Sequence, residues 1–397
     1  MSPRLAVLGA FAFPYPQGSQ LYLAGQVQAL AHAGADPAIL CYGSGLGEAP
    51  TGIERISPAP GLAPRALGSG LHWAKPAADL ALLATATRSA RRARRAGQPF
   101  QFLLAHNAEA ALIALAGRRS FGAPVVYVAH TLWQQELSAY LPRPWKARAE
   151  AMGARLDRFL ARRADGIIAL AEETRSALGE VARHPVALIP PGLEAGPAPG
   201  AERIAEVCRA RGLSAGGYDL YSGNRDRYQD LGLLEAAARR AGASSKPLVV
   251  ASHAEPGQGE DRAGPAATGA VRWIRVRHFE EMRALVHGAH CLIAPRQRLG
   301  GFPIKLLNYM EAGLPIVAVT GAAPGLVHGE SAWLMDPGQG AEGLAQARAE
   351  LASNNELRVR LGDGARAHLA AYHGWPHLAS QTLEYLASLP PRAGRPG

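Results

Sequence analysis

Cysteine, lysine and long apolar runs are all scarce in this chain of 397 residues. The three cysteines, Cys41, Cys208 and Cys291, lie far apart and form no C-x-x-C pair, which argues against a disulfide framework or a zinc finger. We therefore expect buried thiols and a reducing, cytoplasmic compartment. No apolar run approaches the ~20 residues that a membrane-spanning helix needs, so no transmembrane segment is expected.

Acidic residues are outnumbered by basic ones, and nearly all of the basic ones are arginine. The chain has 42 Lys and Arg against 32 Asp and Glu, a net charge of +10, and only four of the cations are lysine. This balance is compatible with nucleic acid, anionic lipid or a phosphorylated substrate as partner. Because zinc-finger spacing and an aromatic RNA-binding signature are both absent, no nucleic-acid partner is expected.

Two basic stretches leave two interpretations open. Arginines cluster at the end of a helix expected over residues 79–96, and residues 133–163 place Trp145, Phe159 and other apolar side chains between arginines. A basic amphipathic helix can lie in a membrane interface, so an anionic membrane surface is one candidate partner, with the protein either free in the cytoplasm or at the inner face of the membrane. The commoner structure is a core-packed helix with a charged outer face.

The length favours two domains, since a single hydrophobic core seldom extends over so many residues. A stretch rich in Gly, Pro and Ala at residues 194–200 is the expected linker. We predict a first domain over residues 1–193, a second over 194–372, and a C-terminal helix within 373–397 that returns to the first domain.

The opening of the chain predicts the class of fold. Residues 4–11 indicate a buried parallel strand, Gly18 lies in the following loop, and residues 20–32 have helical periodicity. Strand, glycine loop and helix form the first unit of a doubly wound α/β sheet, whose ligands lie beyond the carboxyl ends of the strands. Gly18 is therefore expected to face the ligand site.

Two later strands, within residues 102–107 and 125–131, each carry a histidine at their end, His106 and His130. The carboxyl ends of parallel strands meet at the ligand edge of such a sheet, so these side chains should converge there. Either histidine could instead cap its strand by hydrogen bonding to the backbone.

Residues 300–319 combine a glycine turn, a helix, a glycine stop and a buried strand. Pro303 suits the first helical turn, and Gly313 suits a left-handed C-terminal cap. Lys305 and Asn308 lie one turn apart on a polar face. The glycines allow a ligand to approach the unpaired N–H groups of the first turn, which with the helix dipole form an anion site. We therefore expect a phosphate there.

This stretch resembles the donor-binding motif of family-4 retaining glycosyltransferases, whose usual form is E-G-F-G, a short apolar run, a second E and A-M-A-A-G-x-P-V-V-A. Here G-F-P-I-K-L-L-N-Y-M stands in place of the E-x7-E motif, with Gly300 and Asn308 at the positions of the two glutamates. An asparagine amide can still bind a ribose diol, whereas Gly300 offers only its backbone.

The resemblance extends in order over nearly the whole chain and implies a GT-B fold, in which two doubly wound Rossmann-like domains face a central cleft. The first domain would be the acceptor side, with His130 as the catalytic residue and His106 as a structural one. Gly223-Asn224 and Gln229-Asp230 stand where the family has G-R and K-G. Arg225 or Arg227 could supply the missing charge on the diphosphate.

The second domain would bind the nucleotide sugar, and Lys305 is the first choice for a phosphate contact, followed by Arg296. The full set of donor-binding residues that the resemblance implies is Gly18, Asn224, Arg225, Gln229, Arg296, Gly300, Gly301, Phe302, Ile304, Lys305, Leu306 and Asn308. No D-x-D pair occurs, which agrees with a site that needs neither metal nor cofactor and neutralises the diphosphate with helix N-termini and cations.

The implied activity is transfer of a hexosyl unit from a UDP- or GDP-linked sugar to an acceptor hydroxyl with retention of configuration, in glycolipid or polysaccharide assembly. The acceptor would be lipid-linked or a saccharide. Since both signature glutamates are replaced, one rival is a nucleotide-sugar-binding protein that has lost transfer and acts as a partner or scaffold. Another is a GT-B epimerase or phosphorylase, for which we find neither a pyridoxal lysine nor extra acid–base carboxylates.

Overall fold

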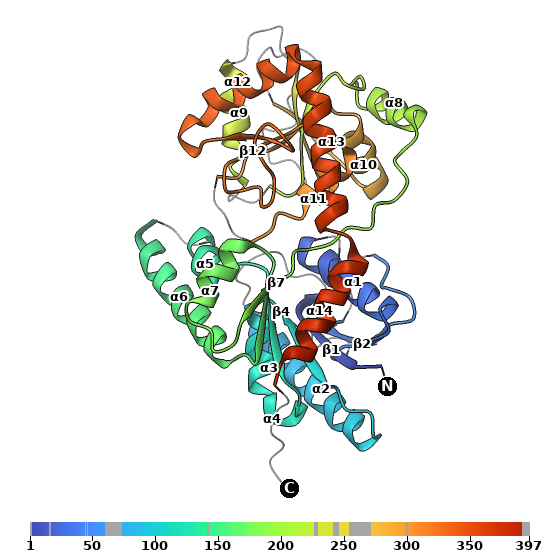
Figure 1. Ribbon diagram of the computed structural model, residues 1–397, viewed down its shortest axis with the longest axis vertical. Helices are drawn as coiled ribbons and strands as arrows, with labels where there is room; N and C mark the ends of the chain where they lie inside the picture. Colours follow the sequence, from blue (N-terminus) through green and yellow to red (C-terminus); the bar gives the residue numbers. More distant parts are fainter. Residues whose placement is uncertain are drawn as a thin grey trace. The chain divides into compact units, whose positions relative to one another are not determined.

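The computed structural model describes residues 2–15, 17–43, 45, 47–59, 74–140, 143–225, 229–240, 246–253, 271–297 and 301–390. The chain divides into two compact units (Figure 1). Unit 1 comprises residues 1–192, 300–302 and 374–397, and unit 2 comprises residues 193–299 and 303–373. The donor-like stretch is thus divided, because Gly301 and Phe302 group with unit 1 and the helix that follows groups with unit 2.

Unit 1 is built on a seven-stranded sheet in the order β3-β2-β1-β4-β5-β6-β7, in which all neighbours are parallel. Its strands are β1 Arg4–Ala12, β2 Asp36–Tyr42, β3 Glu54–Ile56, β4 Phe102–His106, β5 Val125–Ala129, β6 Gly166–Ala169 and β7 Val186–Leu188. Strands β5 and β6 are apolar and buried along their whole length because a parallel sheet is covered on both faces.

The helices of unit 1 are α1 Gly18–His32, α2 Lys75–Arg95, α3 Asn107–Ala116, α4 Arg118–Phe121, α5 Trp133–Tyr140, α6 Lys146–Arg163, α7 Glu172–Gly179 and α14 Trp375–Ser388. A 3-10 turn, η1 Arg143–Trp145, precedes α6. The C-terminal helix α14 packs on α1, and the Tyr385 hydroxyl accepts a hydrogen bond of 2.8 Å from the backbone N–H of Ile167 at the start of β6 (Figure 1).

Unit 2 has a six-stranded parallel sheet in the order β10-β9-β8-β11-β12-β13. Its strands are β8 Asp219–Ser222, β9 Leu248–Ser252, β10 Arg272–Arg275, β11 Cys291–Ala294, β12 Ile316–Val319 and β13 Trp333–Met335. Its helices are α8 Ala201–Ala210, α9 Gly232–Arg240, α10 Phe279–His287, α11 Lys305–Ala312, α12 Gly340–Ser353 and α13 Asn355–Tyr372, and the 3-10 turn η3 Pro337–Gln339 precedes α12.

Both sheets are doubly wound, which confirms the predicted α/β class. In unit 1 the order of strands reverses between β1 and β4, and in unit 2 it reverses between β8 and β11. The crevice outside the carboxyl ends of the strands at such a switch point is where open α/β sheets bind ligands. The residues that follow β1, β4, β8 and β11 are therefore the first to consider for function.

The edge strand β3 at residues 54–56 was not predicted, because a three-residue, largely exposed strand has no buried apolar run to reveal it. Two local predictions were wrong. Residues 133–163 form two helices, since Pro144 lies in the 3-10 turn that separates them. Helix α11 begins at Lys305 and has 8 residues, because Pro303 lies before its N-cap, Ile304.

Candidate functional site

A chain of three polar side chains lies at the carboxyl edge of the unit 1 sheet. His106 ends β4, His130 follows β5, and Ser19 is in the first turn of α1. The Nδ1 atom of His106 lies 3.0 Å from Nε2 of His130, and Nδ1 of His130 lies 3.2 Å from the Ser19 hydroxyl oxygen. The predicted convergence of the two histidines is present, and both ring nitrogens of His130 are engaged within the protein.

Burial keeps this histidine pair neutral. His106 is 0% exposed and His130 is 8% exposed. Desolvation holds the pKa of His106 well below its ordinary value, with a further lowering from His130, and it lowers the pKa of His130 to about 3. Between two neutral imidazoles, either ring can donate the one hydrogen bond and the other accept it. The hydrogen bonds among His106, His130 and Ser19 can therefore reverse direction when the histidines change tautomer. Ser19, which is half-buried, is its most accessible member.

An aromatic wall holds the histidine pair in place. The Tyr22 ring lies 5.5 Å from His106 and 5.2 Å from His130, and it stacks on Trp375 at 5.8 Å between centroids. A Cβ atom on Gly25 would lie 2.4 Å from the Trp375 ring, so only glycine fits beneath that indole. Ser19 and Tyr22 were not predicted, and the one local signal for Ser19 is its place next to Gly18, the exposed first residue of α1.

The entry to the donor-like stretch touches the same edge. Gly301 has a φ of +77°, and a Cβ atom there would lie 1.8 Å from the carbonyl oxygen of His130. Any other residue would push the two segments apart, so glycine is required both by the left-handed backbone and by the contact. Phe302 follows and is buried. Gly300 and Arg227 lie outside the described residues.

In unit 2, Lys305 lies at the carboxyl edge of the sheet in a nest of polar side chains. Its Nζ atom donates to the Tyr221 hydroxyl at 2.7 Å and to Oε1 of Gln229 at 2.9 Å, and it lies 3.9 Å from the centroid of the Tyr221 ring. A Cβ atom on Gly223, whose φ is +132°, would lie 3.0 Å from that ammonium. The glycine after β8 therefore leaves room for the lysine side chain.

Asn224 and Gln229 belong to this nest. Nε2 of Gln229 donates to Oδ1 of Asn224 at 2.9 Å, and the Tyr221 hydroxyl donates to the Asn224 carbonyl at 2.6 Å. The guanidinium of Arg225 lies 4.6 Å above the Trp273 ring, which positions its cation beside the nest by cation–π contact. The predicted residues Asn224, Gln229 and Lys305 are thus brought together.

Helix α11 presents the remaining predicted donor residues. Lys305 and Asn308 lie on its half-buried face, whereas Leu306 is fully buried and anchors the helix to the sheet, so only the Leu306 backbone could meet a ligand. Ile304 is the half-buried N-cap residue, and Arg296 is half-buried just after β11.

Beside Asn308, a small pocket opens in unit 2. It is lined by Ser222, Phe279, Met282, Arg283, Val286, Asn308 and Glu311. Glu311 pairs with Arg283, and its Oε2 atom lies 3.7 Å from His287. Burial opposes ionisation of Glu311, but its hydrogen bonds to His287 and Arg283 outweigh that cost and hold its pKa below the ordinary value. The carboxylate nearest Asn308 on this helix is therefore an ion-pair partner.

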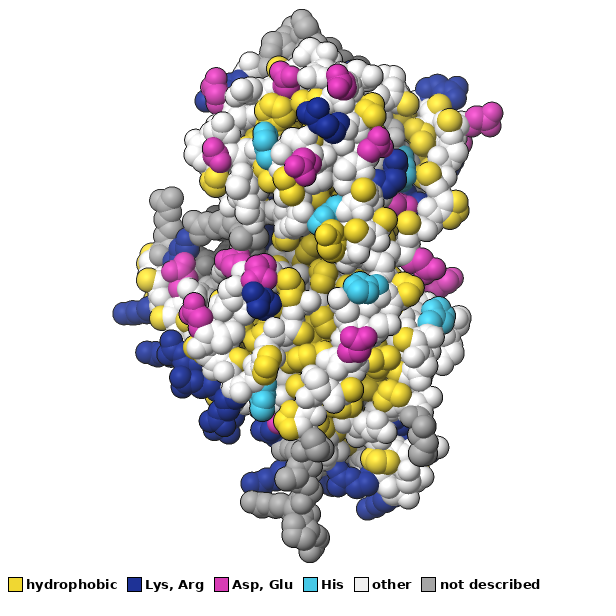
Figure 2. Space-filling model, viewed as in Figure 1, with side chains coloured by type: hydrophobic (Ala, Val, Ile, Leu, Met, Phe, Trp, Pro, Cys, Tyr) yellow, Lys and Arg dark blue, Asp and Glu magenta, His cyan; other side chains and the backbone are white. Residues whose placement is uncertain are grey.

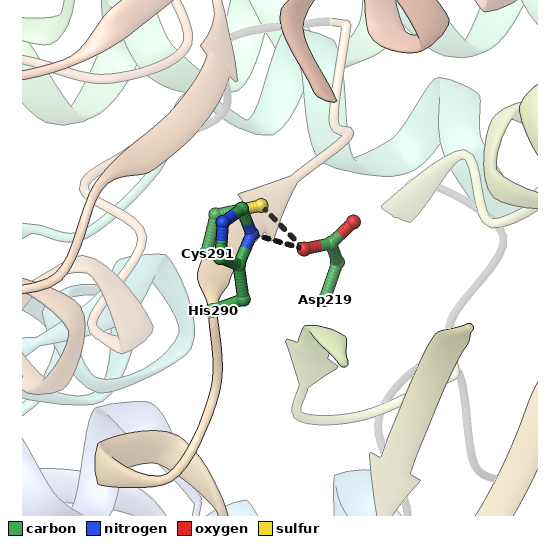
Figure 3. A group of neighbouring side chains, drawn as sticks. All are labelled: Asp219, His290 and Cys291. Atoms are coloured by element: carbon green, nitrogen blue, oxygen red, sulfur yellow. Dashed lines mark hydrogen bonds and ion pairs between the residues drawn. The ribbon is translucent and has the colours of Figure 1, made fainter. Parts of the chain in front are cut away.

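One group of potential metal ligands occurs among the described residues: Asp219, His290 and Cys291 (Figure 3). His290 Nδ1 lies 3.0 Å and Cys291 Sγ 3.1 Å from Oδ1 of Asp219, and Arg348 donates to Oδ2 at 2.6 Å. Burial and the neighbouring Asp219 carboxylate raise the pKa of the Cys291 thiol, which disfavours the thiolate that a metal would need. The group begins β8 and β11, at the edge opposite Lys305, and is best explained as a buried ion-pair cluster.

Two protein-family models match the chain. The model for Glycosyltransferase Family 4 matches residues 16–195, and the model for Glycosyl transferases group 1 matches residues 222–354. The chain belongs to the family-4 glycosyltransferases. The resemblance predicted from the donor-like stretch is thereby confirmed.

One protein of known sequence and two solved structures show what the chain is similar to. A D-inositol 3-phosphate glycosyltransferase of Corynebacterium urealyticum is 30% identical over 123 residues, which span 30% of this chain and only 28% of that protein. Sucrose-phosphate synthase from Thermosynechococcus elongatus has a TM-score of 0.76 at 18% identity, over 98% of this chain and 99% of that one. Anabaena HepE in complex with UDP-glucose has a TM-score of 0.69 at 15% identity, over 97% and 100%.

The two solved structures cover this chain almost completely, so the predicted GT-B fold is confirmed. Because their sequence identity to this chain is only 18% and 15%, these structures show the fold and do not show the substrate. Among the described residues, no helix of this family-4 protein has both the length and the apolarity to cross a membrane.

Proposed function

We propose that the protein transfers a hexosyl unit from a nucleoside diphosphate sugar to an acceptor hydroxyl, with retention of configuration. The observation that carries the proposal is the polar nest of unit 2, in which Lys305 is held by Tyr221 and Gln229 beside Gly223 and one helical turn before Asn308. An ammonium fixed near a helix N-terminus is suited to a diphosphate, and an amide one turn further is suited to a ribose diol.

The reaction we propose needs no metal. The acceptor oxygen bonds to the anomeric carbon on the face from which the diphosphate departs, the bond between that carbon and the phosphate oxygen breaks, and the acceptor proton passes to the departing diphosphate. Lys305, with Arg225 and Arg296 as further cations, and the N–H groups at the start of α11 would stabilise the charge that develops on that leaving group.

Unit 1 would supply the acceptor side. His130 is oriented by His106 and Ser19 through both of its ring nitrogens. It can therefore donate to a sugar or acceptor hydroxyl only by releasing one of those contacts, and the Ser19 hydroxyl is the more accessible of the two partners. We propose that Ser19 yields to the substrate while His106 keeps the ring of His130 in place.

The sugar nucleotide we favour is UDP-linked, with a GDP-linked donor as the alternative. Support for UDP comes from the fold relative HepE, which binds UDP-glucose. For the acceptor we propose a lipid-linked or polymeric saccharide in glycolipid or polysaccharide assembly. The strongly basic composition supports this choice, since lipid-linked acceptors carry phosphate at an anionic surface.

Titration calorimetry with UDP-glucose and GDP-mannose tests the donor site. Lys305→Ala should weaken binding of the accepted nucleotide sugar by roughly 1–3 kcal/mol, as expected for loss of a charge-assisted hydrogen bond. Lys246→Ala is the matched control, because this lysine of the same unit donates to the Gly216 carbonyl away from the nest. Equal affinity in wild type and Lys305→Ala would contradict the assignment, and a product with inverted anomeric configuration by NMR would contradict retention.

One observation favours a second candidate, a nucleotide-sugar-binding protein without transfer. Gly300 and Asn308 replace both glutamates of the signature, and the nearby Glu311 is engaged with Arg283. Donor binding that depends on Lys305, without transfer to water or to any saccharide or lipid acceptor in a broad panel, would support this candidate.

A further inference from the structure

Helix α6 in unit 1 leaves a stripe of large apolar side chains in solvent. Trp145, at the end of η1, is 53% exposed, Met152 is 55% exposed and Phe159 is 44% exposed. The three positions are spaced by seven residues, so they lie along one side of the helix over about 20 Å. Soluble proteins usually bury such side chains, so a row of them suggests contact with a partner.

Arginines accompany this stripe, and the exposed face of α6 carries no acid. The exposed charged residues of the helix are Arg148, Arg155, Arg158, Arg162 and Arg163, while its two acids, Glu150 and Asp157, are half-buried and buried. Figure 2 shows the resulting group of basic side chains over the lower left of the molecule, where Figure 1 draws α6. No ion pair joins these five arginines to a carboxylate within the described part of the chain.

The arginines and the apolar side chains are arranged together. Arg148 lies 5.2 Å from the Trp145 ring centroid, and Arg163 lies 5.5 Å from that of Phe159. Arg148, Arg155 and Arg162 each follow one member of the apolar stripe by three residues, so basic and apolar rows run side by side. The exposed face of α6 thus presents apolar side chains and arginine cations next to each other.

The inner face of α6 fixes the helix with the stripe facing outward. The carboxylate of Asp157 accepts hydrogen bonds of 3.0 Å from the backbone N–H groups of both Trp133 and Gln134 at the start of α5. A Cβ atom on Gly153 would lie 2.5 Å from the backbone of Gln134, so the two helices are in close contact. Rotating α6 to bury the stripe would break both hydrogen bonds, so the exposure belongs to the folded unit.

We infer that α6 docks on an anionic lipid bilayer, with Trp145, Met152 and Phe159 inserted among the lipids and the arginines bound to phosphate groups. Tryptophan favours the membrane interface, and a guanidinium binds phosphate oxygens in pairs. Because the helix exposes no acidic side chain, it would not repel an anionic bilayer. In this arrangement α6 lies in the membrane interface and does not span the bilayer. The inference rests on the proposed function in that a lipid-linked acceptor would be reached at the bilayer surface. The contact of α6 with the bilayer itself requires no nucleotide sugar.

Flotation of the full chain with vesicles tests the inference independently of donor binding. Vesicles of phosphatidylcholine with 30% phosphatidylglycerol should carry the wild-type protein upward at low salt, and pure phosphatidylcholine vesicles should carry far less. The triple variant Arg155→Gln, Arg158→Gln, Arg162→Gln should lose binding by about 100-fold, at roughly fivefold for each arginine. The triple variant Trp145→Gln, Met152→Gln, Phe159→Gln should lose binding while keeping the net charge.

The matched control is Arg209→Gln, Arg239→Gln, Arg240→Gln, which makes the same change in net charge at exposed positions of unit 2. This control should float like wild type. Equal flotation of the control and the triple arginine variant of α6 would overturn the inference. Unchanged flotation of the triple variant at Trp145, Met152 and Phe159 would also overturn it. So would displacement of the protein from the vesicles by short duplex DNA at equal phosphate concentration. Since the substituted side chains are exposed, thermal melting should be unchanged, and UDP-glucose affinity reports separately on the donor site.

Discussion

His130 is the residue on which the acceptor side of the proposed reaction depends, and its environment differs from that of an ordinary surface histidine. Both ring nitrogens are held by protein partners, and burial keeps the ring neutral. A neutral ring at a fixed angle can donate or accept one hydrogen bond with little reorganisation when a substrate replaces Ser19. Its contribution would then be orientation rather than gain or loss of charge.

His130→Ala should lower the rate of transfer by roughly 100-fold, as loss of one preorganised hydrogen-bonding group does, and leave the affinity for the nucleotide sugar nearly unchanged. Ser19→Ala should lower the rate less, because the substrate is expected to take the place of the Ser19 hydroxyl. Steady-state kinetics and calorimetry on the same preparations measure both effects.

Ser380→Ala, on the exposed face of α14, is the control for loss of a hydroxyl. A collapse of nucleotide binding in His130→Ala would make His130 a structural residue or part of the donor site. A larger loss of rate in Ser19→Ala than in His130→Ala would reverse the roles that we assign to them.

How far the sequence predicts these residues depends on where their partners come from. His106 and His130 could be predicted to meet, because strand ends converge by the geometry of the sheet alone. The roles of Asn224, Gln229 and Lys305 came from a family resemblance, and their contact joins residues 76 positions apart. Ser19 had no such signal, because serine at the start of a helix is ordinary and its partner lies 111 positions away.

At the scale of the element, α11 shows which part of a helix periodicity can predict. The shared face of Lys305 and Asn308 and the left-handed cap at Gly313, with φ of +63°, were predicted correctly. The start at Lys305 was not, because the turn at Pro303 closes through a hydrogen bond of 2.9 Å from Leu306, which the sequence does not reveal. The helix is also fastened by Tyr309, whose hydroxyl accepts from the backbone N–H of Ser222 at 2.8 Å.

Tyr309→Phe should destabilise unit 2 by about 1–3 kcal/mol, because it leaves the buried N–H of Ser222 without its partner. It should also weaken UDP-glucose binding, since the end of β8 and the start of α11 both belong to the proposed donor site. Urea denaturation followed by circular dichroism and calorimetry give the two quantities. Tyr372→Phe, at a residue that is 59% exposed, is the control, and equal stability of the two variants would show that the hydrogen bond to Ser222 contributes little.

At the scale of the whole molecule, the neutral histidine pair predicts a loss of stability in mild acid. The folded pKa values of His106 and His130 are depressed, so between about pH 6.5 and the folded values the unfolded chain binds protons that the folded chain refuses. The free energy of unfolding should therefore fall with falling pH by up to about 1.4 kcal/mol per pH unit for each histidine.

Buried carboxyl groups act in the opposite direction, since desolvation raises the pKa of Glu136 and of Asp79. We therefore compare slopes between variants. Urea denaturation at pH 7.0, 6.0 and 5.0 should show a smaller loss of stability for His106→Asn, His130→Asn than for wild type, and exposed His377→Asn should leave the slope unchanged. The same slope in the double variant and wild type would mean that the pair is protonated in the folded protein.

The place of α14 has a consequence for how the protein is made. This helix belongs to unit 1, where Trp375 fills the space above Gly25 and Tyr385 bonds Ile167, yet it follows all of unit 2 in the chain. When residues 1–192 have emerged from the ribosome, the sheet of unit 1 is complete but helix α14, which packs on α1, has not yet been translated. Unit 1 can therefore complete its packing only after unit 2 has been synthesised, which leaves the surface around Tyr22 and Gly192 open to chaperones during translation.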